Sequence, residues 1–91
     1  MDKKIIRRRY RFYGSVQGVG FRYRAKHAAD MYRVTGWVHN CYDGTVEMEA
    51  EGPEESLDMV IQTLRNARFI FIDRIEVKEI PIEDSRSFGV R

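Results

Sequence analysis

The stretch Arg7–Arg33, RRRYRFYGSVQGVGFRYRAKHAADMYR, decides the fold, because a strand, a glycine-rich loop and a helix follow one another in it directly. Charged and aromatic residues alternate over 7–13, which is typical of a half-buried strand. Three glycines within 14–20 predict a loop. The side chains expected toward the core are Tyr10 and Phe12, and those expected toward solvent are Arg7, Arg9 and Arg11.

A helix is predicted over 21–33, because its apolar side chains recur at helical spacing. Offsets of four, seven, eight and eleven from the first of them fall on one face, and these residues are Phe21, Ala25, Ala28, Ala29 and Tyr32. Thr35-Gly36 ends this helix, and 37–40 begins a second strand. Asp43-Gly44 predicts a hairpin turn, since both residues tolerate a positive φ, and 45–51 alternates as the returning strand.

The second half of the chain begins with a helix start at Gly52-Pro53-Glu54-Glu55. Proline suits the first helical turn, and carboxylates suit the positive end of the helix dipole. The apolar residues that follow at helical spacing are Leu57, Val60, Ile61 and Leu64. A further strand is expected over 74–80, with Pro81 ending it, and a short closing strand at 88–91. The apolar run Phe69–Ile72 receives no predicted structure.

The order of elements is therefore β-α-β-β-α-β, the ferredoxin-like arrangement of an α+β protein. We expect a two-layer sandwich, an antiparallel sheet with two helices on one face, as a single domain over 1–91. The first and third strands are neighbours at the centre of such a sheet. This pairing sets three arginines opposite three glutamates on the open face, Arg7, Arg9 and Arg11 beside Glu47, Glu49 and Glu51.

The composition excludes several classes of protein. A 43% hydrophobic fraction with a net charge of only +2 indicates a folded globule rather than a disordered chain. One cysteine excludes an internal disulfide, and no apolar run has the length of a transmembrane helix. Without a signal-peptide core after the first charged residues, a cytoplasmic location is expected. Two histidines and one cysteine, without ligand spacing, predict no metal site.

The loop before the first helix has the chemistry of an anion cradle. Between Gly14 and Arg22, a glycine-rich turn can aim several backbone N–H groups inward, and the helix adds its positive end. Arg22 lies in the first helical turn, where its planar guanidinium can grip two phosphate oxygens. Each feature also has a structural explanation, since glycines close many turns and a helical arginine is usually solvated.

Asn40 is the second candidate, an amide at the end of a strand beside the predicted hairpin. Its carbonyl oxygen can hold a water molecule while its NH₂ group donates elsewhere. The alternative is an asparagine that only caps the turn. Strand alternation points His39 to the opposite face. Trp37 is expected in the core, Cys41 is expected to pack rather than react, and His27 is expected on the surface.

Two segments, GSVQGVGFR over 14–22 and TGWVHNCYDGTVE over 35–47, together closely resemble the acylphosphatase family. The resemblance extends over 7–64 and resumes weakly at 75–77 and 88–91. It implies that Arg22 binds phosphate, that Asn40 orients the attacking water, and that no metal or cofactor is needed. The backbone N–H groups that would form the phosphate cradle belong to Ser15, Val16, Gln17, Gly18, Val19 and Gly20.

The implied reaction suits a site without acids, bases or nucleophiles. An acyl phosphate is hydrolysed to inorganic phosphate and a carboxylate, whose conjugate acid has a pKa of about 4. Such a leaving group needs no general acid. The enzyme has to neutralise and orient the phosphoryl group and place a water in line with the bond that breaks. Fixed donors and one cation meet that need.

Three different functions share parts of this pattern. RNA-recognition motifs have the same element order, but Glu47, Glu49 and Glu51 on the third strand would repel phosphate, so no nucleic-acid partner is expected. A domain within a larger maturation enzyme would keep both motifs, and a regulatory ligand-binding domain would share the fold. We expect a monomer without membrane contact; the alternative hypothesis is a dimer contact through Phe69–Ile72, if that run is exposed.

Overall fold

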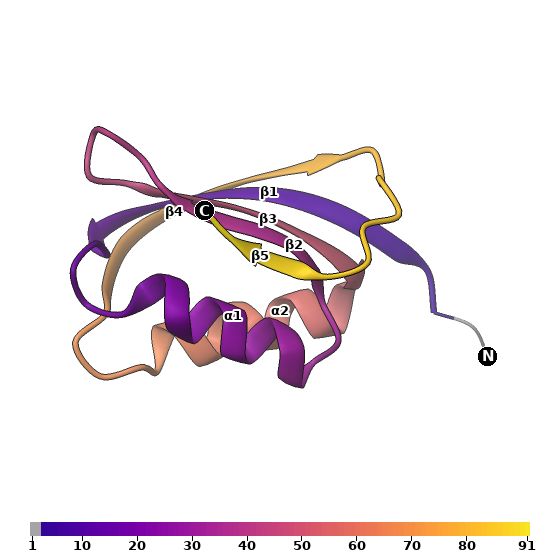
Figure 1. Ribbon diagram of the computed structural model, residues 1–91, viewed down its shortest axis with the longest axis horizontal. Coiled ribbons are helices and arrows are strands. Elements are labelled where there is room, and N and C mark those ends of the chain that lie inside the picture. Colours follow the sequence, from indigo (N-terminus) through magenta and orange to yellow (C-terminus); the bar gives the residue numbers. More distant parts are fainter. Residues whose placement is uncertain (1–2) are drawn as a thin grey trace.

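The computed structural model describes residues 3–91, and Met1 and Asp2 lie outside the described residues. The order of elements agrees with the predicted one (Figure 1). They are β1 Ile5–Ser15, α1 Phe21–Met31, β2 Thr35–Asn40, β3 Val46–Pro53, α2 Glu54–Arg65, β4 Phe71–Ile80 and β5 Phe88–Val90. None of the described helices is long and apolar enough to cross a membrane.

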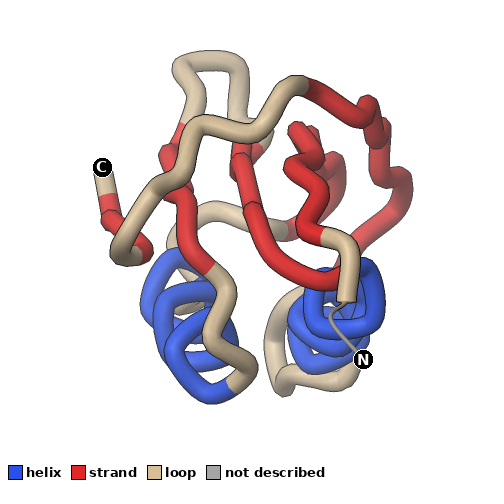
Figure 2. The backbone as a smooth tube through the Cα atoms, turned by 90° about the vertical axis from the view of Figure 1, so that its right-hand side faces the viewer, coloured by secondary structure: helices blue, strands red, loops and turns tan. Residues whose placement is uncertain are grey.

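One sheet carries all the strands in the order β4-β1-β3-β2-β5. β1 and β3 are central neighbours, which confirms the predicted pairing. The four longer strands are antiparallel, whereas β5 joins the edge of β2 in parallel and makes the sheet mixed. Figures 1 and 2 show both helices on one face of this sheet, which confirms the predicted two-layer sandwich.

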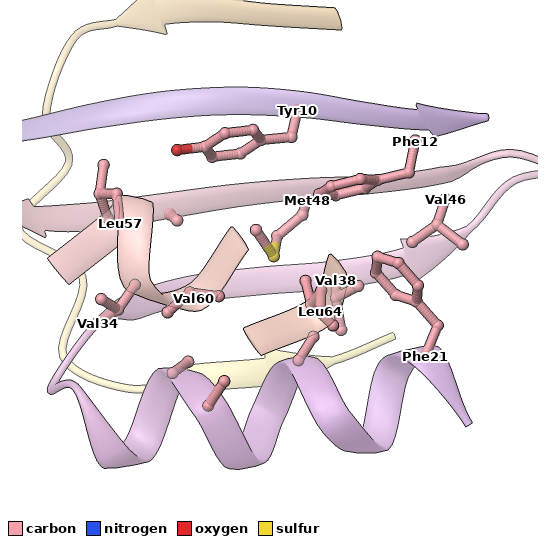
Figure 3. Packing of buried hydrophobic residues seen from close by; sticks show 14 of the residues in the cluster. Tyr10, Phe12, Phe21, Val34, Val38, Val46, Met48, Leu57, Val60 and Leu64 are labelled. Carbon is pink, nitrogen blue, oxygen red and sulfur yellow. The ribbon is translucent and has the colours of Figure 1, made fainter. Parts of the chain in front are cut away.

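The core lies between the helices and the sheet (Figure 3). Tyr10 and Phe12 point into it from β1 as predicted, and the ring of Phe12 contacts that of Phe21 at a centroid distance of 4.8 Å. The helix faces named by the sequence pattern are buried at Phe21, Ala25, Ala28, Ala29, Leu57, Val60 and Leu64. These contacts fix where α1 begins, immediately after the glycine-rich loop.

The opposite face of the sheet corrects one expectation. Arg9 and Arg11 are partly exposed, but the Arg7 side chain is only 1% exposed. Arg7 donates to Glu49 at 2.8 Å and to Glu51 at 3.1 Å. A loop over 81–87 runs across this face (Figure 2) and adds a hydrogen bond from Arg7 to Ser85. Alternation predicts the side of the sheet correctly but cannot show that another segment covers it.

Two smaller segments also differ from the sequence-based view. Trp37 is half-buried on the side of β2 away from the helices, where the Arg91 guanidinium lies 4.5 Å from its ring centre, so its predicted place in the core is wrong. In the apolar run at 69–72, some side chains lie at the surface and others in the core. Phe69 and Phe71 are exposed, Ile70 is buried, and β4 begins at Phe71.

Candidate active site

The loop that joins β1 to α1 holds its backbone open. Gly18 and Gly20 have φ values of 73° and 80°, in the left-handed region that glycine enters without strain. A methyl group on either would meet no atom within 4 Å, so the backbone conformation alone favours glycine there. Gly20 is also the N-cap of α1, and the chain enters the helix from this conformation.

The backbone donors of this loop are unused. Within the described chain, the N–H groups of residues 16–20 donate to no protein oxygen. The first turn of α1 contains no acidic residue that would neutralise the positive end of the helix. Free N–H groups beside a helix N-terminus form a site with the electrostatics to bind an anion.

Arg22 extends from the first turn of α1 beside this loop. Its side chain is exposed, and its Nη1 atom donates to the backbone carbonyl of Arg91 at 3.0 Å. Among residues 3–91, no Asp or Glu side chain lies within ion-pair distance of it. The guanidinium therefore retains N–H donors for a ligand.

Asn40 reaches the same place from the end of β2. Its Oδ1 atom is buried and has no hydrogen-bond partner among the described residues. An unsatisfied buried carbonyl oxygen costs about 1–3 kcal/mol, which a bound water or ligand donor would recover. The turn-capping alternative is therefore not supported, because the turn is held by another side chain, that of Asp43.

The hairpin beside Asn40 is fixed by local hydrogen bonds. Asp43 accepts from the Thr45 hydroxyl at 2.6 Å and from the Thr45 N–H at 3.0 Å. These two bonds lower the pKa of the Asp43 carboxyl. Gly44 completes the turn with a φ of 91°, which confirms the turn predicted from Asp43-Gly44.

Gln17 ties the loop to this hairpin. Its Nε2 donates to the carbonyl oxygen of Cys41 at 2.7 Å and to that of Thr45 at 2.8 Å. The β1–α1 loop and the β2–β3 hairpin accordingly lie at the same end of the molecule (Figure 1). From the sequence, only the backbone of Gln17 is expected to contribute. No local pattern marks the role of its side chain, because both of its acceptors are distant in sequence.

A pocket of about 200 Å³ forms where these parts meet. Its lining includes five of the predicted site residues, Val16, Gly18, Gly20, Arg22 and Asn40, together with Phe21 and Tyr23. Of the remaining predicted cradle residues, Ser15 ends β1 opposite Phe71, and Val19 packs partly against the core. Tyr23 is a lining residue that is not predicted from the sequence, and its position directly after Arg22 is the signal that points to it.

The other candidates from the sequence lie elsewhere. His39 is exposed and absent from the pocket lining, as strand alternation predicted. Cys41 contributes its backbone to the hairpin and is half-buried. Within residues 3–91, no group of three or more His, Cys, Asp or Glu side chains is arranged to hold a metal ion.

Comparison with known proteins identifies the family. The acylphosphatase family model matches residues 8–90. The acylphosphatase of Clostridium acetobutylicum is 44% identical over 79 residues, 85% of this chain and 87% of that protein. The crystal structure of the Bacillus subtilis acylphosphatase superposes with a TM-score of 0.89 at 38% identity, covering 94% of this chain and 98% of that one.

The same domain also occurs inside a longer protein. Full-length HypF, solved in a phosphate- and nucleotide-bound form, matches the whole chain with a TM-score of 0.91 at 29% identity, but the match covers 12% of HypF. The two acylphosphatases compared above are closer to this chain in both identity and length. The chain belongs to the acylphosphatase family, hydrolases that cleave the carboxyl–phosphate bond of acyl phosphates.

Proposed function

We propose that the phosphoryl group of an acyl phosphate binds in the pocket between the β1–α1 loop and Asn40. The observation that carries this proposal is the convergence, in a single pocket, of unused backbone donors and the Arg22 guanidinium, which has no Asp or Glu partner among the described residues. The N–H groups of residues 15–20 surround the phosphate oxygens, and Arg22 pairs with two of them through its planar fork. The bound group then has its negative charge distributed over fixed donors.

Asn40 positions the water that attacks phosphorus. Its unpartnered Oδ1 accepts a hydrogen bond from that water and turns an oxygen lone pair toward the phosphorus atom. The water oxygen forms a bond to phosphorus as the bond from phosphorus to the acyl oxygen breaks. The carboxylate leaves with the electron pair, and the water proton passes to the phosphate product or to solvent. Asn40 is too weak a base to remove that proton itself.

Charge stabilisation in this scheme comes from the protein alone. As charge shifts onto the phosphoryl oxygens, Arg22 and the loop N–H groups are already oriented toward them, so little reorganisation is needed. We infer that the reaction proceeds without a metal ion or cofactor. A carboxylate leaving group, with a conjugate acid of pKa about 4, also removes the need for a proton donor.

We infer a single domain that acts as a monomer in the cytoplasm on a small-molecule substrate. A nucleic-acid partner is disfavoured by the open face of the sheet, where the arginines of β1 are already paired with glutamates of β3. An RNA phosphate would have to displace those glutamates.

The experiment that tests the proposal is hydrolysis of benzoyl phosphate in excess EDTA by the wild type, Arg22→Ala and Arg86→Ala. Arg86 is exposed and has no hydrogen bond or ion pair among the described residues, so it is the matched control. We expect turnover by the wild type and Arg86→Ala, and a loss on the order of 10³-fold for Arg22→Ala. Activity that requires a metal, or that survives in Arg22→Ala, would contradict the proposal.

A further inference from the structure

An exposed aromatic side chain stands at the mouth of the pocket. Tyr23 follows Arg22 in the first turn of α1 and lines the pocket together with Arg22 and Asn40. It is 69% exposed, and no hydrogen bond holds it among the described residues. A ring that is so exposed adds little to the stability of the core. Because Tyr23 lines the pocket, a ligand bound there can contact its side chain.

The apolar surface continues from Tyr23 along α1. Residues four apart lie on one face of a helix, and their side chains lean toward its N-terminus. Tyr23 and His27 have this spacing, and their rings stack at a centroid distance of 6.0 Å with an angle of 22°. Met31, one further turn along, is also exposed. Tyr23, His27 and Met31 form a strip along α1, and their side chains lean toward the end of the helix where the pocket lies.

A shallow groove follows this strip. Its volume is about 220 Å³, and its lining comprises Tyr23, Arg24, His27, Ala28, Met31 and Thr63. Because Tyr23 lines both the groove and the phosphate pocket, the two hollows adjoin at this residue. A ligand that fills the pocket with its phosphate and is longer than the pocket can continue into the groove.

We propose that Tyr23 and His27 bind the acyl group of the substrate and favour acyl phosphates with a flat, apolar acyl group, such as benzoyl, over acetyl phosphate. The inference rests on the proposed function, because it assumes that the phosphate occupies the pocket beside Arg22. Aromatic rings stack in offset or tilted contact and bury apolar area. The two-carbon acetyl group has no ring to stack and only one methyl group to bury, so it gains little from these side chains.

The consequence is a change in specificity rather than in chemistry. Side chains that bind the acyl group, away from the phosphorus atom that reacts, alter kcat/KM only for substrates whose acyl group reaches them. The donors that stabilise the phosphoryl group are separate from the ring of Tyr23. Removing the ring therefore lowers kcat/KM for an aromatic acyl phosphate and leaves that for acetyl phosphate unchanged.

The test measures kcat/KM for benzoyl phosphate and acetyl phosphate, with inhibition by inorganic phosphate, in the wild type, Tyr23→Ala, Tyr23→Phe and Tyr42→Ala. For Tyr23→Ala we expect a fall of about three- to ten-fold with benzoyl phosphate only. Tyr23→Phe keeps the ring and should retain wild-type values. Tyr42 is a fully exposed tyrosine outside both hollows, so Tyr42→Ala is the matched control.

Each other outcome overturns the inference in a recognisable way. An equal fall with both substrates, or weaker phosphate inhibition, would place Tyr23 with the phosphate-binding groups. Unchanged values with both substrates would show that the acyl group does not contact the strip, while leaving the proposed function intact. No turnover of either substrate by the folded wild type would refute the proposed function itself, and the inference with it.

Discussion

Arg7 and Arg22 are chemically identical side chains in opposite situations. Arg7 is 1% exposed, and its donors are bonded to Glu49, Glu51 and Ser85. Arg22 is exposed and makes one bond to a backbone carbonyl. The first holds two strands and a covering loop together. The second keeps most of its donors available at the mouth of a pocket.

The surroundings of the two arginines differ in the same way. Around Arg7, the Glu51 carboxylate also accepts from the Glu83 N–H at 2.7 Å, so the polar groups there satisfy one another. Around Arg22, the loop N–H groups and the Asn40 Oδ1 have no partner among the described residues. Satisfied polar groups stabilise a fold, whereas oriented but unsatisfied groups are ready to bind a substrate.

The largest expected effect is a loss of stability on removing Arg7, whose polar neighbours are all hydrogen-bonded. Arg7→Ala removes the buried cation from Glu49 and Glu51, of which Glu49 keeps only a 3.9 Å contact with Arg9, and we expect the free energy of unfolding to fall by about 3–5 kcal/mol. Urea denaturation measures this change. Arg9→Ala is the control, since Arg9 pairs with Glu47 while half exposed and should cost under about 1 kcal/mol. Equal losses in the two variants would show that burial of Arg7 does not matter.

The next largest effect is a loss of activity on removing Asn40, whose Oδ1 atom has no partner among the described residues. Asn40→Ala removes the oxygen that positions the water, so kcat for benzoyl phosphate should fall by about 10²-fold, with KM and the free energy of unfolding nearly unchanged. His39→Ala, the exposed neighbour on the opposite face, is the control. A normal kcat in Asn40→Ala would return this residue to a structural role.

A smaller effect is expected at the connection between loop and hairpin. Gln17→Leu removes the two bonds that set the loop against the Asn40 hairpin, at a cost of about 1–2 kcal/mol in unfolding free energy. Both carbonyls keep a backbone partner, which limits this cost. We expect a lower kcat, because the distance between phosphate and water is no longer fixed. Gln62→Leu, on the exposed side of α2, should change neither quantity.

The smallest effect is a pH dependence of stability. Burial alone would raise the pKa of the Glu51 carboxyl, but hydrogen bonds from the Glu83 N–H and Arg7 outweigh burial and lower it. A carboxyl with a lowered pKa in the folded state stabilises the protein above its unfolded pKa, about 4.3, and loses that contribution as the pH falls through the folded pKa. The stability difference between wild type and Glu51→Gln should therefore shrink below about pH 4.5. A difference that stays constant down to about pH 3 would contradict this.

Sequence alone predicts those parts of the site that depend only on residues close together in the chain. The glycines at 18 and 20 indicate a loop because they allow a left-handed backbone, and the residues after them indicate a helix by their spacing. Because the helix begins directly after Gly20, Arg22 lies in its first turn. For the same reason, the element order and the pairing of β1 with β3 follow from alternation and turn signals.

Tertiary structure decided everything that depends on segments distant in the chain. The burial of Arg7 needs the loop at 81–87, and the hold of Gln17 on the hairpin needs carbonyls on another element. Likewise, the addition of Tyr23 to the pocket depends on where α1 meets the end of β2. Local propensity sets backbone conformation, but which side chains are covered, paired or left free is decided only when packing brings distant residues into contact.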